Sequence, residues 1–128
     1  MAAVQALFEL DFQERPGGDV IDERLAESKL AADNQEFAGD LLHGVLHHKE
    51  NIDAEIERAA PQWPLEQIAH VDKNVLRLAI YELVFDNSAP PKVAISEAVE
   101  LARLLGSATS PKFVNGVLGA VLAVKEVN

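Results

Sequence analysis

Cysteine is absent from this chain of 128 residues, and methionine, tryptophan and tyrosine each occur once. Without cysteine the protein has no disulfide, no thiolate nucleophile and no cysteine-ligated metal, which is typical of a cytoplasmic protein. Long apolar runs are lacking too, and none approaches the roughly 20 residues that a membrane-spanning helix needs. The first residues, MAAVQ, contain no basic segment and do not resemble a secretory signal. We therefore expect a cytoplasmic protein without a membrane contact.

Positive charge is also scarce, because 11 Lys and Arg stand against 21 Asp and Glu, for a net charge of −10. Residues 1–64 contain 14 acidic and 5 basic residues, a balance of −9, whereas residues 65–128 contain 7 and 6, a balance of −1. An acidic surface repels phosphate backbones and attracts basic proteins. A nucleic-acid contact is therefore expected on the second half of the chain or with the support of a basic partner. Solubility alone is the simpler explanation of the charge.

Helical spacing of the apolar residues extends along the chain, and no segment has the alternation of a strand. The spacing predicts helices over residues 2–13, 20–31, 33–50, 51–59, 73–85, 91–105 and 110–125, with a short helical turn at 65–69. Asp72 is expected as the N-cap of one helix, and Gly106 as the left-handed C-cap of another. The prolines on either side of Trp63 mark a seam between residues 1–62 and 63–128. The sequence therefore predicts a single all-α domain, a helical bundle of about seven helices in two small subdomains.

The segment SPKFVNGVLGAV, residues 110–121, combines two opposite signals. Its Asn-Gly pair is typical of a hairpin turn, yet its apolar residues recur at helical spacing behind Ser110, a good cap, and Pro111, suited to the first turn. We predict a helix, with Lys112, Asn115, Gly116 and Gly119 opposite the apolar face. Glycine inside a helix costs about 1 kcal/mol relative to alanine. Something should therefore approach this face closely, a neighbouring helix of the same chain before a partner.

Catalytic and metal-binding motifs are missing from the sequence. Asp40, His43 and His47 share one helix face, but it is the polar face of an amphipathic helix, and no other helix supplies a matching cluster. His48 and His70 stand alone. We expect no enzymatic activity, no metal and no cofactor.

Polar residues interrupt the apolar helix 73–85 at Arg77, Tyr81 and Glu82. An interhelical ion pair and a buried, hydrogen-bonded tyrosine are the first expectation, and an anchor for a partner is the second. Trp63 is expected to cap the core rather than to bind. Lys112 and Phe113 supply a cation for phosphate and a ring for base stacking, as single-stranded RNA requires. Phe113 also falls on the apolar face, so core packing is its default role.

Four segments, AVQALF (3–8), VLRLAIYEL (75–83), VAISEAVELAR (93–103) and KFVNGVLG (112–119), follow one another over nearly the whole chain. In this order and spacing they resemble the NusB family of bacterial transcription antitermination factors. The resemblance implies an all-helical domain of two subdomains, without catalysis, that binds the boxA element of ribosomal RNA transcripts. It also implies a protein partner, the ribosomal protein NusE, and a role in the antitermination complex that lets RNA polymerase read through termination signals.

The resemblance also implies which residues form the interfaces. Gln5 and Phe8 on the first helix, with Lys112 and Phe113, match positions associated with RNA. Glu82 and the loop around Thr109 match the side that meets NusE. Family members usually begin with an arginine-rich run before the AVQAL segment, whereas Arg15 is the only basic residue among the first twenty here. We therefore expect either a truncated start or RNA binding that depends on the protein partner.

Two other functions fit the sequence. One is the accessory RNA-binding domain found at the N-terminus of some ribosomal RNA cytosine methyltransferases, which is similar, and this would make the chain a fragment. The other is a protein-interaction module without RNA binding, monomeric or a homodimer formed through the small-residue face of the last helix.

Overall fold

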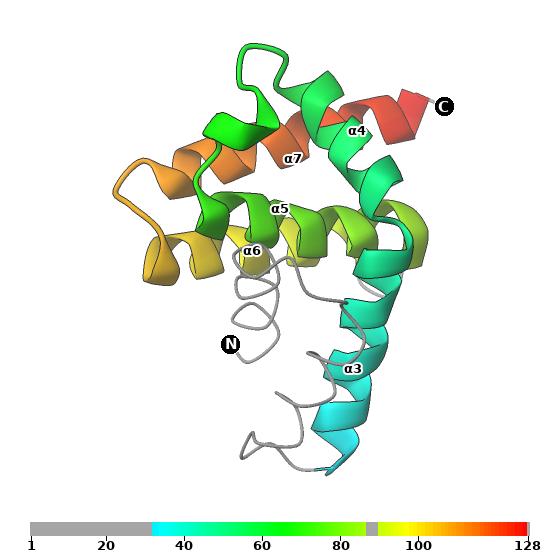
Figure 1. Ribbon diagram of the computed structural model, residues 1–128. Coiled ribbons are helices and arrows are strands. Elements are labelled where there is room, and N and C mark those ends of the chain that lie inside the picture. Colours follow the sequence, from blue (N-terminus) through cyan, green and yellow to red (C-terminus); the bar gives the residue numbers. More distant parts are fainter. Residues whose placement is uncertain (1–31, 87–89, 128) are drawn as a thin grey trace.

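The structure is a computed structural model that describes residues 32–86 and 90–127 (Figure 1). The expected helices over 2–13 and 20–31, with Gln5 and Phe8, lie outside the described residues. The described part contains five α-helices, a 3₁₀ turn and a π-helical turn, and it contains no strand, which confirms the all-α class. In chain order these are α3 (Ala32–His47), α4 (Lys49–Ala59), η1 (Leu65–Gln67), α5 (His70–Ile80), η2 (Tyr81–Asp86), α6 (Pro91–Leu105) and α7 (Ser110–Val127).

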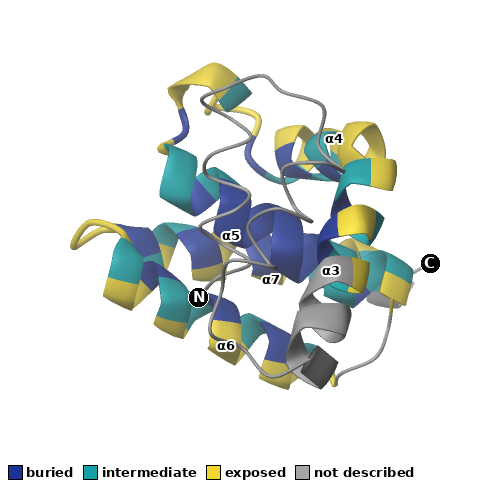
Figure 2. Cartoon of the chain, turned by 60° about the horizontal axis from the view of Figure 1, so that its bottom comes forward, coloured by how far each residue is buried: buried dark blue, intermediate teal, exposed yellow. Residues whose placement is uncertain are grey.

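Helix α5 lies at the centre of the described fold, with α3, α4, α6 and α7 packed against it (Figures 1 and 2). Every residue from Asn74 to Ile80 is buried, so this helix is surrounded on all sides. Helices α6 and α7 also pack on each other. The alanines Ala94, Ala98 and Ala102 form the buried stripe of α6, and such small side chains let α5 and α7 approach it closely. The hydrophobic core of the described residues contains eleven large, fully buried side chains: Leu42, Val45, Ile52, Ile56, Val75, Leu76, Ile80, Leu83, Val114, Leu118 and Val121.

The predicted helix 73–85 changes its winding at Tyr81, where α5 passes into the π-helical turn η2. π-Helical turns are rare in proteins, and those that occur are often found at functional sites. The ring of Tyr81 lies directly over Gly44 of α3, because a Cβ added there would be 2.8 Å from Tyr81 Cε1 and closer to Cζ and the hydroxyl. Tyr81 is half-buried and stacks with His48 and Phe85, whose own ring centroids are 4.4 Å apart. His48 is thus part of an aromatic cluster rather than isolated.

Both cap predictions are wrong. Helix α5 begins at His70 after Ala69, so Asp72 lies inside its first turn instead of capping it. Gly106 has φ −98° and ψ −160°, which is extended backbone and not the left-handed region. Glycine is required at this position for a steric reason instead. A Cβ added to Gly106 would be 2.7 Å from Ser110 Cβ and 2.8 Å from the Ala102 carbonyl oxygen, which is too close. The buried Ser110 hydroxyl accepts the N–H of Ser107 at 2.9 Å and so fixes the loop that leads into α7.

Candidate nucleic-acid and protein interface

A pocket of about 340 Å³ opens where η1, the start of α5 and the loop before α7 meet. Its position follows from the turn at residues 60–64 between α4 and η1, which brings Trp63 beside the beginning of α7. The residues that line it are Trp63, Gln67, Ile68, Ala69, Asp72, Thr109 and Phe113. Two of these, Phe113 and Thr109, are residues that the sequence assigned to an interface.

The aromatic part of the pocket consists of Trp63 and Phe113. Their ring centroids are 6.1 Å apart and their planes are 79° apart, an edge-to-face contact. The prediction that Trp63 caps the core is wrong, because 52% of this residue is exposed. Phe113 packs partly against the hydrophobic core and also lines the pocket, so it combines the two roles considered from the sequence.

The polar part of the pocket is dominated by Asp72. Only 9% of this residue is exposed, and its buried Oδ1 accepts no hydrogen bond from the described residues. A buried acceptor without a partner costs about 1–3 kcal/mol of folding free energy. The first turn of α5 partly compensates, because the N-terminal end of a helix carries partial positive charge that favours a carboxylate. Sequence reasoning missed this residue as a site residue, since it treated Asp72 as a helix cap.

The outer face of α7 continues from the pocket. Lys112, Asn115, Gly116 and Gly119 are all exposed, and no described atom lies within 4 Å of a Cβ added at either glycine. The expected close approach of a neighbouring helix is therefore not found in the described part of the chain. Lys112 makes no ion pair with a described residue, and so its charge is available on the exposed face of α7, next in sequence to the pocket residue Phe113.

Glu82 lies apart from this pocket. It belongs to η2, ten residues after Asp72, which corresponds to about 15 Å along a helix axis. Burial raises the pKa of Glu82 above its ordinary value, and the nearby carboxylates Glu97 and Asp86 raise the pKa further. The structure thus places Thr109 with Phe113 and separates Glu82 from both.

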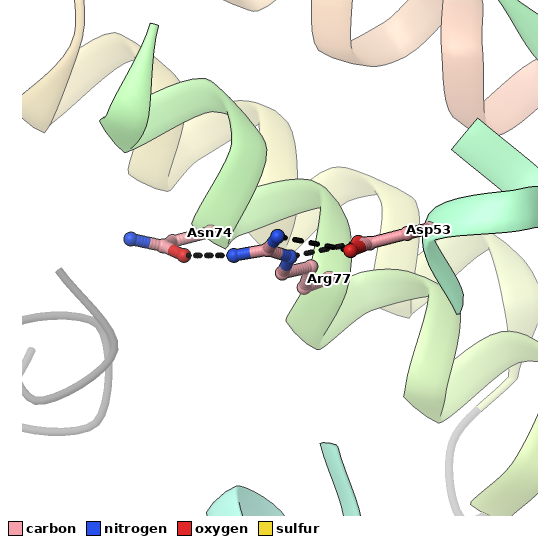
Figure 3. A network of polar contacts seen from close by, with 3 residues as sticks. All are labelled: Asp53, Asn74 and Arg77. Carbon is pink, nitrogen blue, oxygen red and sulfur yellow. Dashed lines mark hydrogen bonds and ion pairs between the residues drawn. The ribbon is translucent and has the colours of Figure 1, made fainter. Parts of the chain in front are cut away.

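An ion pair between α4 and α5 confirms the first expectation for Arg77. Its Nε and Nη2 lie 2.8 Å and 3.0 Å from the two carboxylate oxygens of Asp53, and Nη1 donates to Asn74 Oδ1 at 3.3 Å (Figure 3). This bidentate geometry holds the guanidinium, which is only 6% exposed, inside the fold. Arg77 therefore joins two helices rather than presenting a charge to a partner.

The described residues contain neither a cluster of metal ligands nor a membrane-spanning helix. No three His, Asp or Glu side chains gather there in a way that would hold a metal ion. Asp40, His43 and His47 are exposed on α3. Within the same residues, no helix combines the length and the apolar character that crossing a bilayer requires.

The sequence and the fold of this chain are similar to those of known proteins. The NusB family profile matches residues 1–123. The transcription antitermination protein NusB of Dehalococcoides mccartyi strain CBDB1 is 44% identical over 118 residues, which are 92% of this chain and 82% of that protein. That of Chloroflexus aggregans is 44% identical over 134 residues, with coverage of 100% and 89%. Among solved structures, T. maritima NusB has 35% identity and a TM-score of 0.87, with 95% of this chain and 86% of that chain covered.

A second solved structure contains further molecules. It is the crystal structure of antitermination factors NusB and NusE in complex with dsRNA, in which the matched chain has 29% identity and a TM-score of 0.87. The match covers 96% of this chain and 92% of that one. On the family profile and these relatives, the chain belongs to the NusB family.

Proposed function

We propose that this chain is a transcription antitermination factor that binds boxA-type RNA of ribosomal RNA transcripts together with the ribosomal protein NusE and promotes readthrough by RNA polymerase. The observation that carries the proposal is the family match over residues 1–123. It is supported by the likeness to a chain from a complex of NusB, NusE and RNA. The role is one of binding without catalysis, and it is exerted in the cytoplasm.

The RNA surface is proposed to include Lys112 and Phe113. Lys112 supplies a cation that is not neutralised by a described carboxylate, and Phe113 supplies a ring at the edge of a pocket. Cations that follow the backbone and rings that stack on bases are the usual elements of single-strand recognition. Gln5 and Phe8, outside the described residues, are proposed to extend this surface.

The NusE surface is proposed to include Glu82 and the loop around Thr109. Burial raises the pKa of Glu82, and two neighbouring carboxylates, those of Glu97 and Asp86, raise the pKa further. A basic protein would relieve this repulsion, and such charge complementarity speeds association and sets the register of a complex. Thr109 lines the pocket that contains Phe113, so its loop would lie where the RNA and the protein meet.

The proposed architecture is a single domain over residues 1–128, with subdomains of about 1–62 and 63–128. Two helices within residues 2–31 would complete the count of about seven. The net charge of −10 supports RNA binding that depends on NusE, because the isolated chain repels a phosphate backbone.

The test is the anisotropy of a labelled boxA RNA titrated with the chain, with and without NusE, at low and moderate salt. We expect NusE to tighten RNA binding, and Lys112→Ala to weaken it and to lower the salt slope by about one unit. Phe113→Leu keeps an apolar side chain and removes the ring, and should cost about 1–3 kcal/mol of binding free energy. Lys49→Ala, on the exposed start of α4, is the matched control.

The alternatives give different results in the same titration. A chain that binds NusE and no RNA under any condition is a protein-interaction module. One that binds RNA equally with and without NusE fits the accessory domain of a methyltransferase, and it would contradict the partner dependence.

A further inference from the structure

We propose that the pocket between Trp63, Asp72 and Phe113 holds one unpaired RNA base and selects bases with an exocyclic amino group, such as cytosine, over uracil. The proposal rests on the proposed RNA-binding function and adds to it the base preference of the site. It is carried by the juxtaposition of an exposed indole with a buried carboxylate oxygen that accepts no described hydrogen bond.

The carboxylate determines which base edge fits. Asp72 is nine-tenths buried and lines the pocket, and its Oδ1 has no donor among the described residues. This oxygen is enclosed, so the carboxylate would turn toward the pocket to accept from a base. An aspartate is an acceptor only, so a ligand that satisfies it must donate an N–H group. We propose that the base lies with its C4 edge against Asp72. In that orientation the amino group of cytosine donates to the carboxylate, whereas uracil presents an oxygen, which is an acceptor, at the same position.

The aromatic side chains determine how the base lies. Trp63 and Phe113 meet edge to face, so a base cannot insert between them and must stack on one exposed ring. Trp63 is 52% exposed and provides such a ring beside the pocket. A volume of about 340 Å³ lies at the lower end of the range of ligand pockets, which suits a single base. Gln67 and Thr109 add polar groups to the same wall.

The charge next to the pocket favours RNA over a basic protein side chain, the other ligand that a carboxylate and two rings would accept. Lys112 directly precedes Phe113, is exposed, and has no carboxylate partner among the described residues. A second cation entering beside it would be repelled. The phosphate attached to a base in the pocket would instead be attracted to it.

Trp63 is the single tryptophan of the chain, so its fluorescence reports directly on this pocket. The whole chain with NusE is titrated with single-stranded oligocytidylate and oligouridylate of equal length, and both Trp63 emission from the difference spectrum and RNA anisotropy are followed. We expect oligocytidylate to change Trp63 emission and to bind at least about fivefold more tightly than oligouridylate. Trp63→Ala, at an exposed position, should weaken oligocytidylate binding more than oligouridylate binding.

Asp72→Asn provides the decisive variant, because an amide of the same shape can donate to the uracil oxygen. The preference for oligocytidylate should vanish or reverse in Asp72→Asn. It should persist in Glu57→Gln, which removes one negative charge from an exposed position of α4. A preference unchanged by Asp72→Asn would overturn the base-selective pocket.

Two further outcomes separate this inference from the proposed function. RNA binding by anisotropy without a Trp63 signal or base preference would refute the pocket and leave the antitermination role standing. A Trp63 signal, lost in Asp72→Asn, that a polyarginine peptide produces and RNA does not would assign the pocket to a basic protein. Absence of RNA binding even with NusE would refute both.

Discussion

Gly44→Ala is expected to destabilise the protein although alanine is the better helix former. In the middle of a helix the substitution alone would add about 1 kcal/mol of stability. Here the new Cβ would lie 2.8 Å from Tyr81 Cε1 and closer to two other ring atoms. Carbon atoms pack at about 3.5–4.0 Å, so the ring would have to retreat by about 1 Å.

Tyr81 has little room for that movement, because it is half-buried on a π-helical turn and its ring lies against the stacked pair of His48 and Phe85. Overpacking of this kind costs about 1–3 kcal/mol, which exceeds the gain from helix propensity, and the net result should be a loss of up to about 2 kcal/mol in the free energy of unfolding. Urea denaturation of Gly44→Ala measures the loss.

A double-mutant cycle isolates the cause. In a Tyr81→Ala background the obstructing ring is gone, so Gly44→Ala should become stabilising by up to about 1 kcal/mol. This change of sign is specific to contact between the two residues. If Gly44→Ala costs the same in both backgrounds, the ring does not explain the glycine and the reasoning is refuted.

Four other substitutions have defined outcomes. Gly116→Ala and Gly119→Ala face open space among the described residues, and each should raise the free energy of unfolding by up to about 1 kcal/mol in urea denaturation. Arg77→Met should lower it by about 2–4 kcal/mol, because Asp53, only 18% exposed, loses its bidentate partner; a smaller loss than that of an exposed lysine variant would contradict this role. Glu82 has a raised pKa in the folded state, so the fold binds its proton more tightly and stability falls as the pH rises from the unfolded pKa through the folded one. Glu82→Gln should therefore stabilise the chain at pH 7 and not below the unfolded pKa of about 4.3, and equal effects at both pH values would exclude this explanation.

Helical periodicity predicted most of the described elements because it reports burial along one face, and burial is what orders these helices. The helix predicted over 91–105 begins and ends at the residues observed for α6, and α7 begins at Ser110 as predicted. Proline at the first turn is a strictly local signal, which explains this accuracy. The Arg77 ion pair was predictable for a similar reason, since a charge inside an apolar stripe needs a partner.

The features that sequence reasoning missed depend on contacts between distant segments. The π-helical turn at Tyr81 accommodates a ring over Gly44, which is 37 residues earlier in the chain. Trp63 meets the ring of Phe113, 50 residues later in the chain, at the start of α7. Neither of these contacts has a signature in the local pattern.

Both proposed interfaces contain a polar side chain that is unfavourable in the isolated fold. Asp72 carries a buried acceptor that no described group satisfies, and Glu82 carries a carboxylate that burial and like charges disfavour. Each lowers the stability of the isolated fold, and each is relieved by one kind of ligand, an N–H donor for Asp72 and a cation for Glu82. Local rules are violated most often where a protein binds. Ligands that satisfy these groups should therefore stabilise the fold by mass action, RNA through Asp72 and a basic protein through Glu82. Asp72 and Glu82 lie ten positions apart on α5 and η2, so a base at Asp72 and a basic side chain at Glu82 would not compete for the same group.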